Sequence, residues 1–171
     1  MKSWVERILA TVSVVLLASS VAACSGGGVD PTAKPYVSPS PSSPANPSNP
    51  KATLTVYASP TCGCCHLYIP YLRENGYAVN EVSVQDINAP KEKYGVPEEA
   101  WSCHTATVDG YFIEGHVPVE AIDKLLTEKP AIDGIALPGM PPGSPGMNGE
   151  KTARFEIVAI KDGKIQPFMT I

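Results

Sequence analysis

The sequence has few charged side chains, and it concentrates neither sign of charge. Charged residues make up 18% of the 171 residues and aromatic residues 7%, whereas about a quarter of an ordinary soluble protein is charged. Seventeen acidic and thirteen basic residues give a net charge of −4, and the acidic residues are scattered. Nucleic-acid binding needs a basic stripe or patch. We therefore exclude a nucleic-acid partner and expect one globular domain.

The sequence also lacks an apolar run long enough to cross a bilayer, which takes about 20 residues. Its longest run, Ile8 to Ala18, follows the basic residues Lys2 and Arg7 and precedes small residues. This order is typical of a secretory signal peptide, here residues 1–23. The last residues, Val21-Ala-Ala-Cys24, resemble the lipobox of bacterial lipoproteins. The resemblance implies that Cys24 is lipidated and anchors the protein in the cell envelope, either in the periplasm or on the extracellular face of a membrane. The alternative is ordinary cleavage that leaves a free thiol.

Proline, serine and glycine dominate the segment after Cys24. Seven prolines lie between residues 25 and 50. Such a stretch buries too little apolar surface to offset the entropy of ordering it. We therefore predict a flexible tether over residues 24–50 and one folded domain over residues 51–171.

Hydrophobic patterning predicts an α/β domain in residues 51–171. We expect strands at 53–58, 77–84, 105–108, 111–114, 154–161 and 164–170, and helices at 62–75, 87–94 and 118–129. Asp-Gly pairs at 109–110 and 162–163 are strong hairpin signals. In the first helix we expect an apolar side made by Leu67, Ile69, Tyr71 and Leu72. A loop rich in Gly, Pro and Met, residues 133–149, precedes the C-terminal β-hairpin.

This order of elements, with cysteines where the first helix begins, is thioredoxin-like, with a mixed sheet flanked by helices. Cys62-Gly-Cys-Cys65 resembles the thioredoxin active-site helix, including Pro70 five residues later. The resemblance implies that Cys62 and Cys65 are the catalytic redox pair and that Cys64 is an addition. The positive end of a helix stabilises thiolates, which are both nucleophiles and soft metal ligands. Two structural disulfides are the alternative, which the adjacent Cys64 and Cys65 make awkward.

Cys103 precedes the strand predicted at 105–108. In a thioredoxin-like sheet this strand begins beside the first helix, so Cys103 and His104 are expected to face the other three cysteines. The hairpin at 105–114 returns the chain to the same end, which brings His116 there as well. Thioredoxins have a proline near the position of His104. This sequence lacks that proline, which argues against plain disulfide exchange. We interpret His66 as a solvated side chain or a neighbour that tunes a thiol pKa.

Methionine is scarce, and its positions suggest the metal. Apart from the initiator, the sequence holds only Met140, Met147 and Met169. Met140 and Met147 lie in the Gly/Pro loop, while Met169 is expected in the core. Thiolate and thioether together are a soft donor set that selects Cu(I). Alternatively, the two loop methionines pack the loop onto the core.

Four motifs in order resemble the CopG-like copper-resistance proteins, long filed as a domain of unknown function. They are Cys62-Gly-Cys-Cys65, Trp101-Ser-Cys-His-Thr105, Gly115-His-Val-Pro118 and Pro138-Gly-Met-Pro-Pro-Gly-Ser-Pro-Gly-Met147. The resemblance implies a thioredoxin-like domain that binds several copper ions through bridging cysteines in copper resistance. It implies as cluster ligands Cys62, Cys64, Cys65 and Cys103, and as further ligands His104, His116, Met140 and Met147.

Three functions follow as hypotheses. The first is an envelope copper-binding protein that holds Cu(I) and cycles between Cu(I) and Cu(II), with copper ions and copper-handling envelope proteins as partners. The second is a thioredoxin-like thiol-disulfide oxidoreductase of the envelope. The third is a binding module that passes copper to another protein.

Overall fold

The computed structural model describes residues 50–171 of the chain. The predicted signal peptide at 1–23, the predicted lipidation site Cys24 and the part of the predicted tether up to residue 49 lie outside the described residues. Among the helices that are described, none has the length and apolarity needed to cross a membrane.

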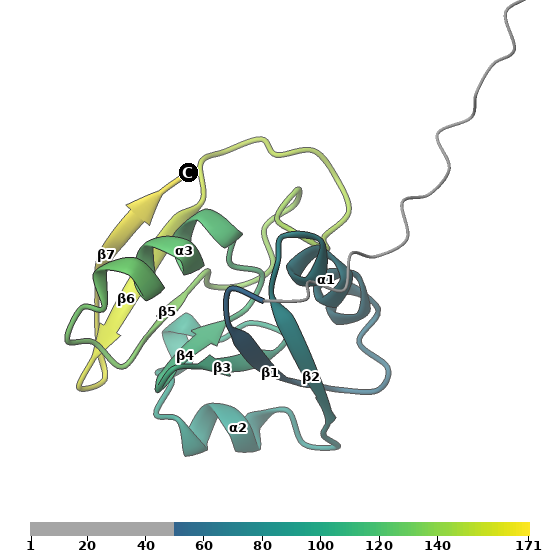
Figure 1. Ribbon diagram of the computed structural model, residues 1–171, viewed down its shortest axis with the longest axis horizontal. Helices are drawn as coiled ribbons and strands as arrows, with labels where there is room; N and C mark the ends of the chain where they lie inside the picture. The colour runs from purple at the N-terminus through teal and green to yellow at the C-terminus, as the bar shows by residue number, and fades with distance from the viewer. Residues whose placement is uncertain (1–49) are drawn as a thin grey trace, which may run out of the picture. The chain divides into compact units, whose positions relative to one another are not determined.

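One mixed sheet runs through the described domain (Figure 1). Its seven strands, in spatial order, are β2 (Ala78–Ser83), β1 (Thr53–Ala58), β3 (Thr105–Val108), β4 (Tyr111–Glu114), β5 (Gly134–Ala136), β6 (Glu156–Lys161) and β7 (Lys164–Thr170). The pairs β1–β2 and β4–β5 are parallel and the other neighbours are antiparallel. Both predicted hairpins are present, at β3–β4 and β6–β7.

Helices cover both faces of this sheet. Helices α1 (Gly63–Glu74) and α3 (Val119–Glu128) bury their apolar sides in one large core with alternate residues of the strands. The short helix α2 (Asn88–Lys93) and the 3₁₀ turn η1 (Glu98–Ala100) lie at the other face, where a smaller cluster centres on Phe112 and Ile160. The predicted α/β, thioredoxin-like fold is confirmed.

The inner side of α1 differs from the predicted one. The buried residues are Cys65, Tyr68, Ile69 and Leu72, at the i, i+3, i+4, i+7 spacing of one helix face. Leu67, which we placed on the apolar side of the helix, is 54% exposed and does not belong to the buried side. The buried side of α1 begins with Cys65, which packs in the large core as a small apolar residue does.

Strand β5 lies within the predicted loop 133–149, and the sequence pattern missed it. Three residues are too few to show alternation. Strand β5 pairs in parallel with β4, and a Cβ at Gly134 would collide with the Phe112 carbonyl oxygen. Because the two strands are parallel, Leu137 leaves β5 at the end of the sheet where β4 ends, and its N–H donates to the Glu114 carbonyl over 3.0 Å. The rest of the loop therefore begins beside the predicted site.

Candidate metal centre

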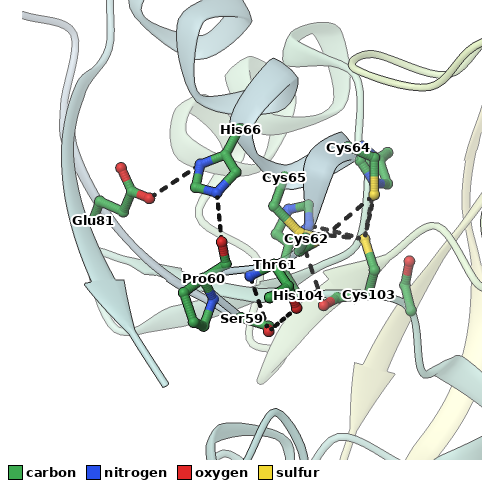
Figure 2. The surroundings of a disulfide bond; sticks show 12 residues. Ser59, Pro60, Thr61, Cys62, Cys64, Cys65, His66, Glu81, Cys103 and His104 are labelled. Atoms are coloured by element: carbon green, nitrogen blue, oxygen red, sulfur yellow. Dashed lines mark hydrogen bonds and ion pairs between the residues drawn. A yellow bond between two sulfur atoms is a disulfide. The ribbon is translucent and has the colours of Figure 1, made fainter. Parts of the chain in front are cut away.

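Cys62 and Cys65 mark the beginning of α1. Cys62 is the N-cap residue, and its Sγ forms a disulfide with Cys65 Sγ, as Figure 2 shows. The turn before the helix is held by the Cys62 N–H, which donates to the Ser59 carbonyl over 3.0 Å. Within residues 50–171 this is the one disulfide, and Cys64 and Cys103 are free thiols. The alternative of two structural disulfides is therefore not what the structure shows.

The two free thiols point toward the disulfide and toward each other (Figure 2). Cys64 Sγ lies 3.4 Å from Cys62 Sγ and 3.6 Å from Cys103 Sγ. Cys65 Sγ lies 3.8 Å from Cys103 Sγ. All four sulfur atoms lie within 4.8 Å of one another. Helix phase could not be read from the sequence to within one residue, and the structure turns Cys64 inward.

Cys103 also belongs to a second group of potential ligands, with His104 and His116. Its Sγ lies 2.9 Å from His116 Nε2 and 3.3 Å from His104 Nδ1. The expectation that the β3–β4 hairpin returns the chain to the thiols is thus met, because His116 comes two residues after β4 ends. Cys103 is the residue common to both groups.

His116 is oriented by the Gly/Pro loop. Its Nδ1 lies 2.6 Å from the Pro145 carbonyl oxygen, so Nδ1–H donates there and Nε2 presents its lone pair toward Cys103. Metal-binding histidines are fixed in this way by a hydrogen bond from the other ring nitrogen. Burial lowers the pKa of His116, although the hydrogen bond to Pro145 opposes the shift. The ring is therefore neutral at pH 7, the form that binds metal.

His104 is fully buried between aromatic rings. Its centroid lies 4.8 Å from that of Tyr68 and 4.9 Å from that of His116. Burial first, and then the nearby His116 and Lys91, hold the pKa of His104 well below its usual value. Among the buried side-chain polar atoms of residues 50–171, its Nε2 alone lacks a hydrogen-bond partner. The His104 nitrogen that faces Cys103 Sγ is the other one, Nδ1, so Nδ1 is the candidate ligand atom of this residue.

Burial raises the pKa of Cys103 to about 12, and the neighbouring Cys64 adds to the shift. The side chain is therefore a thiol at neutral pH in the metal-free protein. A cation that binds there must displace a proton, so binding is coupled to proton release. Sulfur and imidazole nitrogen without a carboxylate form a soft donor set that suits Cu(I).

The two loop methionines differ in burial. Met140 is 54% exposed, and Met147 is half-buried. The loop itself is fixed near the thiols, since the Gly139 N–H donates to the Trp101 carbonyl over 3.0 Å. A Cβ at Gly146 would lie 2.7 Å from Tyr68 N and 2.9 Å from Cys64 O, so the loop rests on the first turns of α1. A ligand role for Met140 and Met147 stays a prediction.

His66 points away from the thiols, as Figure 2 shows. Its Nδ1 lies 3.4 Å from Glu81 Oε1 and its Nε2 lies 3.2 Å from the Pro60 carbonyl oxygen. The interpretation of His66 as a solvated side chain is consistent with this position, and the contacts join α1 to β2 and to the turn before Cys62.

Sequence reasoning missed a buried ion pair behind Cys103. Lys91 Nζ lies 2.5 Å from Glu114 Oε1, and neither side chain is more than 2% exposed. Burial raises the pKa of Glu114, while the Lys91 ammonium and hydrogen bonds from Thr105 and Ser102 oppose the shift. The one available signal was a glutamate at the end of an otherwise apolar strand.

Comparison with known proteins agrees with this geometry. Residues 100–147 match the family "Protein of unknown function, DUF411", and no curated protein matches. The solved structure "Copper resistance protein copG- Form 2" is 38% identical, with a TM-score of 0.66 over 70% of this chain and 98% of that chain. "Copper resistance protein copG- Form 1" is also 38% identical, with a TM-score of 0.64 over 70% of this chain and 96% of that one. The chain therefore belongs to the CopG copper-resistance family.

Proposed function

We propose that this protein, once the Cys62–Cys65 disulfide is reduced, binds copper as Cu(I) through Cys62, Cys64, Cys65 and Cys103 and acts in copper resistance. The observation that carries the proposal is the convergence of four sulfur atoms within 4.8 Å. The names of the two similar structures support copper as the metal. Thiolates favour Cu(I) over harder ions, which agrees with those names.

We further propose that the centre holds more than one copper ion. The all-cysteine group and the group with His104 and His116 overlap only at Cys103. A thiolate sulfur at such a junction can bridge two soft ions. The neutral imidazole of His116, with Nε2 aimed at Cys103, is the best oriented nitrogen ligand for the second ion.

The Cys62–Cys65 disulfide connects copper binding with redox chemistry. Oxidation of the Cys62 and Cys65 thiols to this disulfide releases two electrons and two protons. Two Cu(II) ions would accept the two electrons and become Cu(I), and the protons would pass to solvent, so the centre is suited to Cu(I)/Cu(II) cycling. Anaerobic addition of Cu(II) to the reduced chain tests this step. Loss of two Cu(II) from the electron paramagnetic resonance signal for each Cys62–Cys65 disulfide formed would support it, and persistent Cu(II) with unchanged thiols would contradict it.

An anaerobic Cu(I) titration of the reduced full-length chain tests the main proposal. We expect more than one tightly bound copper per chain, and a reduced count after Cys103→Ser because both groups use this sulfur. Cys24→Ser is the matched control, since Cys24 is the proposed lipidation site and is not among the proposed ligands. Fewer than one tight copper per chain, or an undiminished count in Cys103→Ser, would reject the proposal.

A thiol-disulfide oxidoreductase is the second candidate. It is favoured by one observation, the Cys62–Cys65 disulfide where α1 begins. Insulin reduction distinguishes the two functions. Turnover that survives both Cys64→Ser and Cys103→Ser would favour the oxidoreductase, because neither residue belongs to its redox pair.

We propose that the protein is lipid-anchored in the cell envelope through Cys24, where copper-handling envelope proteins are its partners. The signal-like residues 1–23 and the lipobox-like residues before Cys24 support this location. Mass spectrometry of the N-terminal peptide from the membrane fraction is the test. A lipid adduct on Cys24 is expected, and an unmodified Cys24 thiol would contradict the proposal.

A further inference from the structure

The buried pair of Lys91 and Glu114 is not explained by metal ligation, because neither residue belongs to the groups that could hold an ion. Transfer of two charges from water to a protein interior is costly. Apolar residues of similar size often make a protein as stable as a buried ion pair does, or more stable. The pair therefore needs another reason to be retained. Its hydrogen-bond partners suggest one.

The Glu114 carboxylate holds both ends of a short segment. Its Oε1 accepts a hydrogen bond from the Ser102 N–H over 2.7 Å, and its Oε2 accepts one from the Thr105 hydroxyl over 2.7 Å. The two residues between Ser102 and Thr105 are Cys103 and His104. One carboxylate thus brackets two candidate ligands.

The Lys91 ammonium completes this arrangement from the other side. Besides Glu114, it reaches Thr105 Oγ1 at 3.5 Å. In helix α2 the buried residues are Lys91 and Pro90 alone, so the ammonium is a main contact of this helix with the domain. Lys91 both balances the Glu114 charge and fixes the direction of its oxygens.

Regular secondary structure does not hold Cys103 itself. Strand β3 begins at Thr105, and the Gly115 N–H bonds to the His104 carbonyl over 2.9 Å. At Gly115, φ is +78° and an added Cβ would lie 2.5 Å from Ser102 Oγ. The segment from Ser102 to Thr105 therefore begins in close contact with this glycine. The backbone N–H of Ser102, directly before Cys103, is fixed by Glu114.

From these contacts we infer that Lys91 and Glu114 are positioning residues that hold Cys103 in place for metal before any ion arrives. The inference rests on the proposed function. Holding Cys103 Sγ 3.6 Å from Cys64 and 3.8 Å from Cys65 lowers the rearrangement that binding requires. Residues that orient metal ligands typically change affinity by about 10- to 100-fold when replaced.

The test compares the full-length chain with its Lys91→Met/Glu114→Gln variant. This double substitution removes both charges together, so that neither charge is left buried without its partner. Two quantities are measured: Cu(I) affinity by competition with a chromophoric chelator, and the rate at which iodoacetamide alkylates Cys103 in the metal-free disulfide form. We expect affinity at least about tenfold weaker and Cys103 alkylation several-fold faster. Ile160→Val, in the core at the same face of the sheet, is the control for lost stability and is expected to change neither quantity.

A lowered melting temperature with unchanged affinity and unchanged Cys103 alkylation would show a purely structural pair and overturn the inference. If the double variant does not fold, Thr105→Val removes one partner of the carboxylate and keeps the branched strand residue. Wild-type affinity and alkylation in that variant would also overturn it. If the unaltered chain fails to bind Cu(I), the proposed function falls, whereas the alkylation rates still decide the positioning role.

Discussion

Cys103 is the residue on which both potential metal groups depend, and its chemistry is set by burial. A pKa of about 12 leaves almost no thiolate at pH 8. Thiolate, not thiol, is the form that reacts with alkylating agents and binds metal. The metal-free centre therefore holds Cys103 in place but protected, and the entering cation must displace its proton.

We predict that Cys103 in the metal-free disulfide form is alkylated at least about tenfold more slowly at pH 8 than an unperturbed thiol, because its thiolate fraction is smaller. Quantifying the modified Cys103 peptide by mass spectrometry against free cysteine checks this. The gap should narrow as the pH rises toward 10. Reaction as fast as free cysteine would mean that Cys103 is not protected.

The two buried histidines make stability depend on pH in the acidic direction. Their pKa values are lowered by burial, so the folded chain resists protonation below pH 6.5 while the unfolded chain takes up protons. The stability that the neutral histidines contribute is fully present above the histidine pKa of the unfolded chain, and it is lost as the pH falls below that pKa. The slope is at most about 1.4 kcal/mol per pH unit for each histidine.

We therefore predict a melting temperature that falls from pH 7 to pH 5 in the metal-free protein, and a shallower fall in His116→Gln, where one of these groups is absent. Thermal unfolding at several pH values is the measurement. The comparison concerns slope, so an overall loss of stability in the variant does not affect it. Equal slopes in both proteins would contradict the assignment.

At the scale of elements, the loop 137–147 supports His116 through its backbone. The sequence pointed to its methionines, but the structure shows the Pro145 carbonyl oxygen bound to His116 Nδ1. Next to it, Gly146 has φ of +79° and faces the backbone of Cys64 and Tyr68. The loop is therefore fastened against α1 at the point where it orients the histidine.

Gly146→Ala is predicted to lower the free energy of unfolding by about 1–3 kcal/mol and to weaken copper binding, because the added Cβ pushes Pro145 away from His116. Gly139→Ala is the matched control, since Gly139 also has positive φ but an added Cβ meets nothing within 4 Å. Calorimetry and chelator competition measure the two effects. Equal binding losses in both variants would show that backbone strain alone is responsible.

Elements were largely predictable where a local signal marks them. The two Asp-Gly turns predicted both hairpins, and strand β1 has the bounds that the sequence predicted, residues 53–58. Strand β5 could not be predicted, because its three residues form a strand by pairing with β4 and have no hydrophobic pattern of their own. The side of α1 was misjudged at Leu67 for a related reason, since Cys65 and Tyr68 face inward through packing against the sheet.

At the scale of the whole molecule, the centre ties together elements that are distant in sequence. Helix α1 and its N-cap residue together supply three cysteines, the segment before β3 supplies Cys103, and the segment after β4 supplies His116. A ligand that binds only the folded arrangement stabilises it, by about 2.7 kcal/mol when its free concentration is 100 times the Kd.

We predict that Cu(I) at 100 times its Kd raises the melting temperature of the reduced chain by about 5–20 °C, the range that such a stabilisation gives for a domain of this size. Addition of a strong Cu(I) chelator should reverse the rise. Differential scanning calorimetry under anaerobic conditions measures it, with Cys103→Ser expected to show a smaller shift. No shift in the unaltered chain would mean that copper does not join these elements.

The sequence by itself determined the thiol-rich beginning of α1, the hairpins and the thioredoxin-like order of elements, because each depends on residues close together in the chain. Tertiary structure alone decided that Cys64 turns inward, that Pro145 orients His116, and that Lys91 and Glu114 bracket Cys103. These are contacts between segments far apart in sequence. Pairing register and helix phase set such contacts to within a few ångströms, and no local pattern carries that information.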